Sequence, residues 1–470
     1  MDSSKIILIT LIVYKIALLA VGFWAKSRVK SESDYFLAGQ GLGAWTAGLS
    51  YAASTSSAWV LLGFTGLVYA QGLVGLWLIP GIFFGYFMTW FVMGPKLNDE
   101  TRDKGHITII DFISEGKTGR WARWIGIISA IIILFSFTFY ISSQLQAAGT
   151  ALTENFNIGT TEAILVGAAI VIIYCFFGGF LAASITDAFQ AIIMMLACII
   201  VPIVTVQAAG GLGETFTLLR ANEPPHYLMV TGQAIGMAGV GFAMGLFGNG
   251  FGAMGQPQLV NRIMAVKSQS ERLKAASITI GWGIIIYAGL SCMALSGRAL
   301  ALETGNEGLI FAAANAYLPA VLAGVVTAAV LSAIMSTVDS LLLAAASAVS
   351  HDIGVKYKSP EQALLFGRIA MVVIALLAVW VTIVWTEDIF NRALFAWVPV
   401  GAAFGPTALT RCLGWRVKAP FILVAIITGF LIAVTFALQS GAYADVIEKW
   451  GSWMVALTIL WLGRERKDAP

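Results

Sequence analysis

The sequence contains little charge. Asp, Glu, Lys and Arg make up 11% of its 470 residues, whereas hydrophobic residues make up 59% and the mean hydropathy is +0.85. A soluble globular domain carries about 25% charged residues, so this composition excludes a soluble enzyme. The apolar runs are continuous and do not alternate in stretches of about ten residues, which excludes a membrane β-barrel. The sequence therefore predicts an all-α polytopic membrane protein.

Cysteine and histidine are also scarce, and the charges nearly balance. The four cysteines lie in or at the ends of apolar runs without C-x-x-C spacing, so neither a disulfide framework nor a zinc site is indicated. The three histidines lie outside the apolar runs or at their ends, which leaves little for acid–base chemistry. The 28 basic and 25 acidic residues form no basic cluster that would suggest nucleic acid. We expect neither an enzyme nor a nucleic-acid partner.

Thirteen apolar runs approach the roughly 20 residues that a membrane-spanning helix needs. They are residues 5–24, 46–70, 74–95, 124–152, 160–179, 183–209, 233–257, 275–299, 319–349, 367–386, 390–410, 419–439 and 446–463. The whole chain is predicted to form one transmembrane domain in the lipid bilayer.

Basic residues predict the orientation of these helices. Of the 28 basic residues, 22 fall in loops on one side, including Arg28 and Lys30 after the first run, Lys356 and Lys358, Arg466 and Lys467, and Arg262 in the loop after residue 257. The positive-inside rule then places the N-terminus outside and the C-terminus in the cytoplasm, as an odd number of spans requires. The chain stops at Pro470, soon after the last run, so we expect no attached kinase domain.

Two carboxylates, Asp187 and Asp339, lie within the predicted spans. A carboxylate at the bilayer centre costs roughly 2.5–3.5 kcal/mol on insertion scales, which makes both residues functional candidates. Ser332, Ser336 and Ser340 repeat at every fourth position beside Asp339 and form a stripe suited to a cation. Small residues at this spacing also suit plain helix packing, and a hydrogen-bonded packing role is the alternative for both carboxylates.

Two predicted helices carry signs of interruption. Residues 50–57 contain five serine and threonine residues, and the segment GLFGNGFGAMGQP at 245–257 is rich in glycine. Broken helices expose carbonyl groups to ions and N–H groups to carboxylates, and they pair in transporters built from inverted repeats. We therefore predict one repeat at about 46–209, a second at about 233–410, and two final helices at about 419–463.

Several motifs together resemble the sodium/solute symporter family over nearly the whole chain, and within it the proline-transporting branch. They are Ala53-Ser54-x-Ser56-Ser57-x-Trp59, GGFLAASITDAFQ around Asp187, GQPQLVNRIMA from Gly255, SAIMST from Ser332 and GAAFGP from Gly401. The resemblance implies a LeuT-like fold of thirteen helices with a five-plus-five inverted repeat. It also implies sodium (Na+) as coupling ion, a small organic solute as substrate, and a place in the bacterial inner membrane.

The resemblance also implies particular ion ligands. The main sodium site is expected at the backbone carbonyls of Ala53, Ser56 and Ala333 and the hydroxyls of Ser336 and Thr337. Such oxygen ligands without a fixed carboxylate suit a hard cation that must be released. A second cation site, or a carboxylate relay for ion exit, is expected at Asp187, Ser336, Asp339 and Ser340.

The expected substrate pocket departs from the proline branch. Its residues are Thr55, Ser57, Trp59, Tyr140, Gln144, Asn249, Ala253, Met254, Gln256 and Pro257. Thr55 stands where that branch usually has Asp, and Asn249, Ala253 and Met254 replace bulky aromatic residues. Proline is the first candidate substrate, and another amino acid, a small organic acid or a sugar-like solute is the alternative. Proton coupling through Asp187 and Asp339 is a rival, and an intramembrane aspartic enzyme is the least favoured class.

Overall fold

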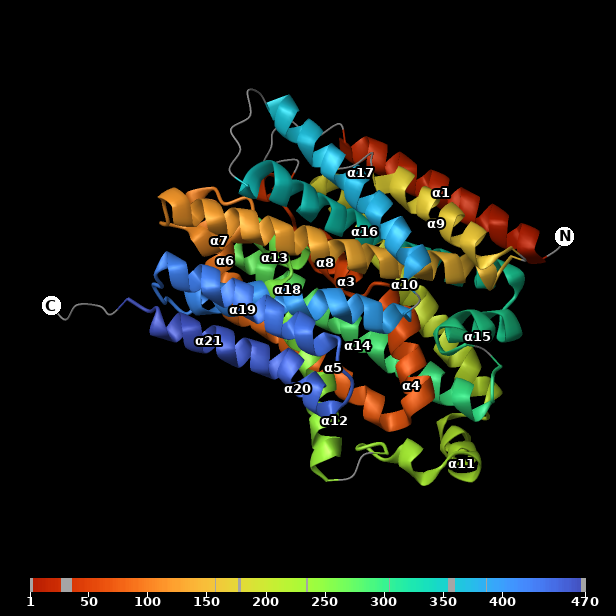
Figure 1. Ribbon diagram of the computed structural model, residues 1–470. Coiled ribbons are helices and arrows are strands. Elements are labelled where there is room, and N and C mark those ends of the chain that lie inside the picture. Colours follow the sequence, from red (N-terminus) through yellow and green to blue (C-terminus); the bar gives the residue numbers. More distant parts are fainter. Residues whose placement is uncertain are drawn as a thin grey trace.

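The computed structural model describes residues 3–26, 36–156, 158–175, 179–233, 236–303, 305–353, 360–385 and 387–465. Within these ranges the chain is helical apart from its connections and two isolated β-bridges. The helices form an elongated bundle with the N- and C-termini at opposite ends (Figure 1). The predictions for Arg28, Lys30, Lys356, Lys358, Arg466 and Lys467 lie outside the described residues.

The first half of the chain forms α1 (Ser3–Lys26), η1 (Ala38–Gln40), α3 (Ala44–Thr55), η2 (Trp59–Phe64), α4 (Thr65–Gln71), η3 (Gly72–Trp77), α5 (Leu78–Phe87), η4 (Met88–Met93), α6 (Gly94–Lys104), α7 (Ile109–Ser114), α8 (Gly119–Thr153), α9 (Thr160–Cys175), α10 (Phe180–Ala208), α11 (Leu212–Asn222) and η5 (Pro225–Leu228). The second half forms α12 (Met237–Gly248), η6 (Asn249–Gly255), α13 (Pro257–Met264), α14 (Gln269–Ala299), η7 (Asn306–Gly308), α15 (Leu309–Tyr317), α16 (Ala320–Ser347), η8 (Ala348–Asp352), α17 (Pro360–Val384), α18 (Ile389–Cys412), α19 (Ala419–Ala437), α20 (Ala442–Val446), η9 (Ile447–Gly451) and α21 (Ser452–Leu462).

In the described part of the chain, nine helical stretches are long and apolar enough to cross a membrane. One of them, Trp59–Lys104, has 46 residues, which corresponds to about 69 Å of helix, far more than a hydrocarbon core of about 30 Å. This stretch is broken at Gly72, whose φ of +73° ends the regular helix. The structure therefore confirms an all-helical membrane protein.

The predicted ranges overlap helices, with boundaries shifted by several residues. α14 begins at Gln269, ahead of the predicted residue 275, because Ser268 caps it by accepting a hydrogen bond from the Glu271 N–H.

Helix also resumes at Pro257, where the predicted span ended, and continues to Met264 as α13. Proline is favoured at the first helical position, since its missing N–H would have no partner there. The placement of Arg262 in a loop is therefore wrong.

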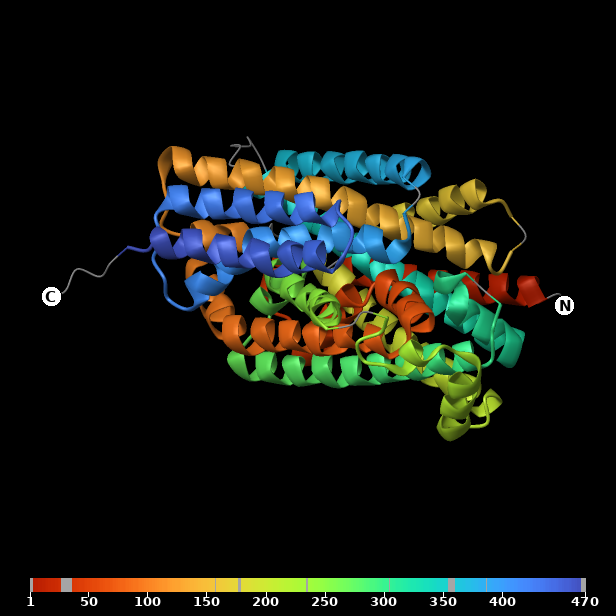
Figure 2. The same ribbon diagram turned by 60° about the horizontal axis from the view of Figure 1, so that its bottom comes forward.

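Two helices form the centre of the bundle. The apolar windows of the stretches Ala320–Asp352 and Ile389–Cys412 are 83% and 89% buried, whereas that of Ala419–Ala437 is 28% buried. α16 packs against α1, α8 and α10, while α18 packs against α8, α19 and η6. In Figure 2 the green helix α14 lies on one face of the bundle and α17 on the opposite face. Polar residues of α16 and α18 are consequently enclosed by other helices.

Close backbone contact joins α18 to the interrupted helix α12–η6–α13. A Cβ atom at Gly252 would overlap the indole of Trp397, and one at Gly401 would overlap the backbone of Gly252. Glycine at both positions lets the backbones approach, as in small-residue contacts of membrane helices. The interruption is therefore held directly against α18.

Replacing Gly252 with alanine tests this contact. Overpacking of a filled interior costs about 1–3 kcal/mol, so we expect a clearly lower midpoint of thermal unfolding for Gly252→Ala in detergent. Gly281→Ala in α14 is the matched control, because no atom lies within 4 Å of its new Cβ. A Gly252→Ala protein as stable as the unchanged chain would contradict the packing argument.

Candidate functional site

The helix that begins at Ala44 is interrupted in the middle of the bundle. α3 ends at Thr55, Ser56 has a non-helical backbone (φ −96°, ψ 64°), and helical geometry resumes at Ala58. The predicted unwinding of the hydroxyl-rich segment is thus present. Backbone groups at a break need other partners, because an unpaired polar group in the interior costs free energy.

Ser336 and the Ala53 carbonyl, both predicted to bind sodium, are in contact at this break. The Ser336 hydroxyl of α16 lies 3.4 Å from the Ala53 carbonyl and 3.1 Å from the Ala333 carbonyl, and these two oxygens share its single proton. The hydroxyls of Ser56 and Thr337 are buried and have no hydrogen-bond partner. Buried polar atoms usually have hydrogen-bond partners, so these two hydroxyls are candidates to bind a ligand. Carbonyl and hydroxyl oxygens are the donors that a hard cation prefers.

The four residues of the expected second cation site lie beside a buried arginine. Asp187 of α10 accepts hydrogen bonds from Ser50 at 2.7 Å and from Arg262 Nη2 at 2.7 Å. The same Arg262 nitrogen donates to Ser340 at 2.5 Å, and Ser340 donates to the Ser336 carbonyl at 2.6 Å. The Asp187 and Arg262 side chains are 1% and 0% exposed. A guanidinium thus lies between Asp187 and Ser340.

Asp339 differs from Asp187 in its contacts. It is 3% exposed, and its Oδ1 atom has no hydrogen-bond partner. Asp187 Oδ1 likewise has none, although its Oδ2 atom is bonded to Ser50 and Arg262. Each carboxylate therefore retains an oxygen that could accept a proton or contact an ion.

Predicted substrate residues surround the second half of the broken helix. The Gln144 side chain accepts a hydrogen bond from the Ala58 N–H at 3.1 Å, and Tyr140 donates one to the Ser57 hydroxyl at 3.4 Å. The rings of Trp59 and Tyr140 lie 6.2 Å and 6.3 Å from Trp397, measured between centroids. Ser57, Trp59, Tyr140 and Gln144 therefore form one group, and Trp397 of α18 completes it.

The other predicted substrate residues face neighbouring backbone. Thr55 donates to the Tyr51 carbonyl of its own helix at 2.7 Å, and Gln256 donates to the Trp397 carbonyl at 2.8 Å. Ala253 packs on Gly85 of α5. Met254 is buried in η6, and Pro257 is the first residue of α13. Thr55 thus lies at the break after α3, and the other four lie at the interruption between α12 and α13.

Asn249 connects the group to a cavity of about 750 Å³. Its side-chain amide donates to the Leu246 carbonyl at 3.1 Å, its Oδ1 atom has no partner, and its carbonyl accepts a bond from Trp397 at 2.8 Å. The cavity is also lined by Gly63 of η2 and Leu394 of α18. It contains five acidic residues, namely Glu307, Glu387, Asp388, Asp445 and Glu448, beside the single cation Lys449. An acidic entrance favours the arrival of cations.

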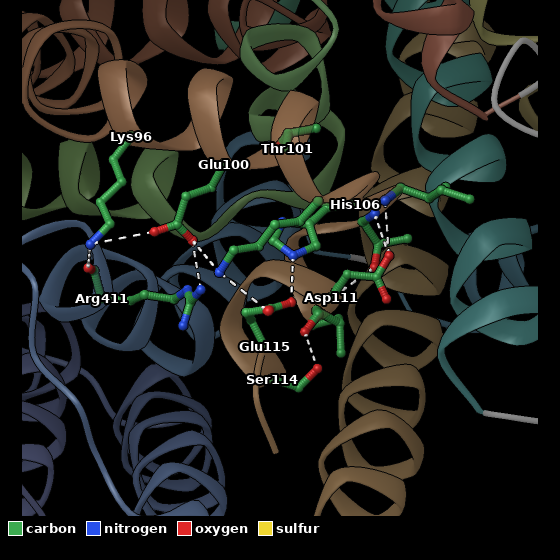
Figure 3. A network of polar contacts seen from close by, with 12 residues as sticks. Lys96, Glu100, Thr101, His106, Asp111, Ser114, Glu115 and Arg411 are labelled. Carbon is green, nitrogen blue, oxygen red and sulfur yellow. Dashed lines mark hydrogen bonds and ion pairs between the residues drawn. The ribbon is translucent and has the colours of Figure 1, made fainter. Parts of the chain in front are cut away.

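Charges also tie helices together at the end of the bundle that carries the C-terminus (Figures 1 and 3). Glu100 of α6 accepts a hydrogen bond from Arg411 of α18 at 2.6 Å, and Lys104 lies 3.2 Å from Glu115. His106 is 2.8 Å from the same carboxylate. This network joins α6, the loop after α7, and α18.

A broken helix enclosed in a bundle of apolar helices, with buried polar side chains beside it, is typical of a membrane transporter. The sodium:solute symporter family model matches residues 35–437 of the chain. The chain belongs to that family, which confirms the resemblance in its motifs.

Individual relatives agree with this assignment. The high-affinity proline transporter PutP of Bacillus subtilis is 30% identical over 89% of this chain and 90% of its own. The sodium/proline symporter of Escherichia coli is 30% identical over 93% of this chain and 88% of its own. A Na+-coupled sialic acid symporter, solved in a substrate-bound outward-open state, has 17% identity and a TM-score of 0.81 over 99% of this chain and 100% of its own. These proteins are transporters and not enzymes.

Arg262 and Trp397 were not among the predicted site residues. Arg262 was hidden by the apparent end of its helix at Pro257, although proline at the start of a helix could have indicated that the span continued. Trp397 lies in an evenly apolar segment without a polar neighbour to distinguish it.

Breaking the buried ion pair should be costly. Asp187→Asn leaves the Arg262 guanidinium without its counter-charge, so we expect the free energy of unfolding to fall by about 3–5 kcal/mol. In the double variant Asp187→Asn/Arg262→Gln no unpaired charge remains, and we expect most of the stability to return. Thermal unfolding in detergent measures Asp187→Asn, Arg262→Gln and the double variant. If the double variant loses as much stability as the two single variants together, the pairing is contradicted.

The environment of Glu307 at the cavity makes the stability of the protein depend on pH. Both of its carboxylate oxygens accept backbone hydrogen bonds at 3.0 Å, from Ile389 and Phe390 in the first turn of α18. Burial raises the pKa of Glu307 from 4.5 to about 7, against the lowering effect of these two hydrogen bonds. Between these values the folded protein holds the proton more tightly than the unfolded chain. The contribution of Glu307 to stability therefore falls as the pH rises through that interval.

Glu307→Gln removes this titration while preserving the shape of the side chain. We expect the difference in unfolding midpoint, unchanged chain minus variant, to decrease from about pH 5 to about pH 8 and then level off. A difference that does not vary with pH would refute this pKa assignment.

Proposed function

We propose that this protein is a sodium-coupled secondary active symporter that imports a small organic solute, with proline as the first candidate. The observation that carries the proposal is the break after Thr55, where Ser336 contacts the Ala53 carbonyl while the Ser56 and Thr337 hydroxyls have no partner. The names of the PutP and sodium/proline symporter relatives support proline and sodium. Together with the membrane helices, these bacterial relatives support a plasma-membrane location.

Sodium binding at the break provides a physical basis for coupling. The ion would take the Ala53, Ser56 and Ala333 carbonyls and the Ser336 and Thr337 hydroxyls as ligands, in place of the Ser336 hydrogen bonds. It would thereby link α3 to α16 and fix the backbone that leads into Ser57 and Ala58. Because sodium orders the segment that the solute contacts, each raises the affinity of the other.

The pocket offers contacts that a zwitterionic amino acid needs. The first N–H group of the second half-helix, at Ala58, currently binds Gln144 and would bind a carboxylate after this side chain moves aside. Trp59, Tyr140 and Trp397 provide aromatic surface for an apolar ring. Thr55 replaces the usual acidic residue of the proline branch, and its hydroxyl is bonded to its own helix. The amino group of the solute would therefore be hydrogen-bonded by Ser57, Asn249 or water.

Membership of the family supports a proposal for the topology and orientation. We propose thirteen spanning helices, a five-plus-five inverted repeat, and an N-terminus outside with a cytoplasmic C-terminus. The cavity at Asn249 is then an outward-facing entrance, and the charge network of Glu100, Glu115 and Arg411 lies on the cytoplasmic side. A second cation at Asp187, Ser336, Asp339 and Ser340 would have to compete with the Arg262 guanidinium, so its entry requires Arg262 to move away.

The energy available from sodium is sufficient for accumulation. One charge crossing about 100 mV supplies about 2.3 kcal/mol, and a tenfold sodium gradient adds about 1.4 kcal/mol. Their sum corresponds to an accumulation of a few hundredfold for each ion that enters with the solute.

Uptake of labelled proline into proteoliposomes tests the function. We expect uptake to require sodium, to disappear when choline replaces it, and to be insensitive to a proton gradient. Thr337→Ala should raise the sodium concentration for half-maximal uptake at least tenfold, since it removes a ligand. Ser129→Ala in α8 is the matched control, because this hydroxyl is also buried and unpartnered but lies on a helix outside the ion site.

Two outcomes would count against the proposal. Uptake that follows the proton gradient without sodium would overturn the choice of coupling ion, and normal sodium dependence in Thr337→Ala would overturn the site. Sodium-dependent stabilisation without any effect of proline would redirect the search to other amino acids, organic acids or sugar-like solutes.

A further inference from the structure

A cluster apart from the transport site combines one imidazole with two carboxylates. Asp111, His351 and Asp352 each have a ligand atom within 4.8 Å of those of the other two. His351 Nε2 lies 2.9 Å and 3.1 Å from the two carboxylate oxygens of Asp111. Asp111 belongs to α7, whereas His351 and Asp352 belong to η8 at the end of α16. Figure 3 shows the Asp111 carboxylate beside the charge network of α6 and α18.

The positions of these donors are fixed by their surroundings. Asp111 accepts backbone hydrogen bonds from Ile107 at 2.9 Å and Thr108 at 3.2 Å in a capping box. The Thr108 hydroxyl donates to Asp352 Oδ1 at 2.6 Å. Gly126 of α8 has no side chain that would displace the Asp352 backbone, which passes close to it. The two elements therefore present their donors in a preformed arrangement.

We propose that Asp111, His351 and Asp352 bind one divalent transition-metal ion of the zinc, cobalt and nickel class. An imidazole nitrogen with two carboxylate oxygens suits these metals, whereas magnesium and calcium prefer oxygen ligands alone. The two carboxylates balance the charge of the ion, and three protein ligands leave a coordination position for water.

The other two histidines lack this arrangement. His106 pairs with Glu115, but Lys104 lies 3.2 Å from the same carboxylate and would repel a metal ion. His226 is hydrogen-bonded to Gln233. Among the described residues, the Asp111 group is the only cluster of three such ligands.

A metal ion in this position would restrain α16. It would tie η8 to α7, and α16 also carries Ser336 and Thr337 of the proposed sodium site. If α16 moves relative to α7 during transport, a bound metal ion slows the cycle. This consequence rests on the proposed function, whereas the metal site itself does not.

Titration of the purified full-length protein tests the site. The protein carries no histidine tag, is first treated with a chelator, and is titrated with Zn2+ in a calorimeter and with Co2+ by visible absorption. We expect one ion per chain, unaffected by excess Mg2+, and a dissociation constant raised at least tenfold by His351→Gln and by Asp352→Asn. His106→Gln is the matched control and should bind like the unchanged chain.

Two results would overturn the metal site: the absence of one-to-one binding by the unchanged chain, or equal binding by His351→Gln. Asp352→Asn keeps the test decisive if His351→Gln does not fold, because its amide oxygen can still accept the Thr108 hydrogen bond.

The restraint on α16 is tested by sodium-driven uptake with Zn2+ present on both sides of the membrane. We expect Zn2+ to inhibit the unchanged protein and to leave uptake by His351→Gln unaffected. Zn2+ that binds in the calorimeter without slowing uptake would overturn the restraint. Absence of sodium-dependent uptake altogether would count against the proposed function, and the calorimetric result would still decide the metal site.

Discussion

The structure depends on a break in hydrogen bonding inside an apolar bundle. A helix in a membrane satisfies its own backbone groups, and wherever it is interrupted other residues must satisfy them. At Ser56 and Ser57 those residues come from two other helices: Ser336 of α16 contacts the carbonyl end, and Gln144 of α8 contacts the N–H end. The break is tolerated because it is enclosed in protein, and the same enclosure is what the proposed binding site requires.

The second interrupted helix supports the first through α18. η6 lies against α18 at Gly252 and Gly401, and Trp397 bonds to the Asn249 carbonyl while its ring approaches Trp59. One tryptophan thereby contacts both interrupted helices. Trp397 therefore couples the packing of the two interrupted helices.

Arg262 and Asp187 illustrate how the interior accommodates charge. An isolated charge there is unfavourable, but this pair is supplemented by hydrogen bonds to Ser50 and Ser340, so that side chains from four helices stabilise the two charges. The pair lies next to the proposed sodium site through Ser340 and the Ser336 carbonyl. Any movement of Arg262 would therefore change the surroundings of the ion.

The sequence by itself determined the all-helical membrane class and the family, because hydropathy and local motifs are encoded in neighbouring residues. It also indicated the break at residues 50–57 and the polar groups of Ser336 and Thr337, since hydroxyls within an apolar span are conspicuous. Only the tertiary structure decided that Arg262 is buried against Asp187, that Gln144 occupies the Ala58 N–H, and that Trp397 joins the pocket. These contacts connect residues far apart in the chain, and no local pattern specifies which distant side chain satisfies a buried polar group.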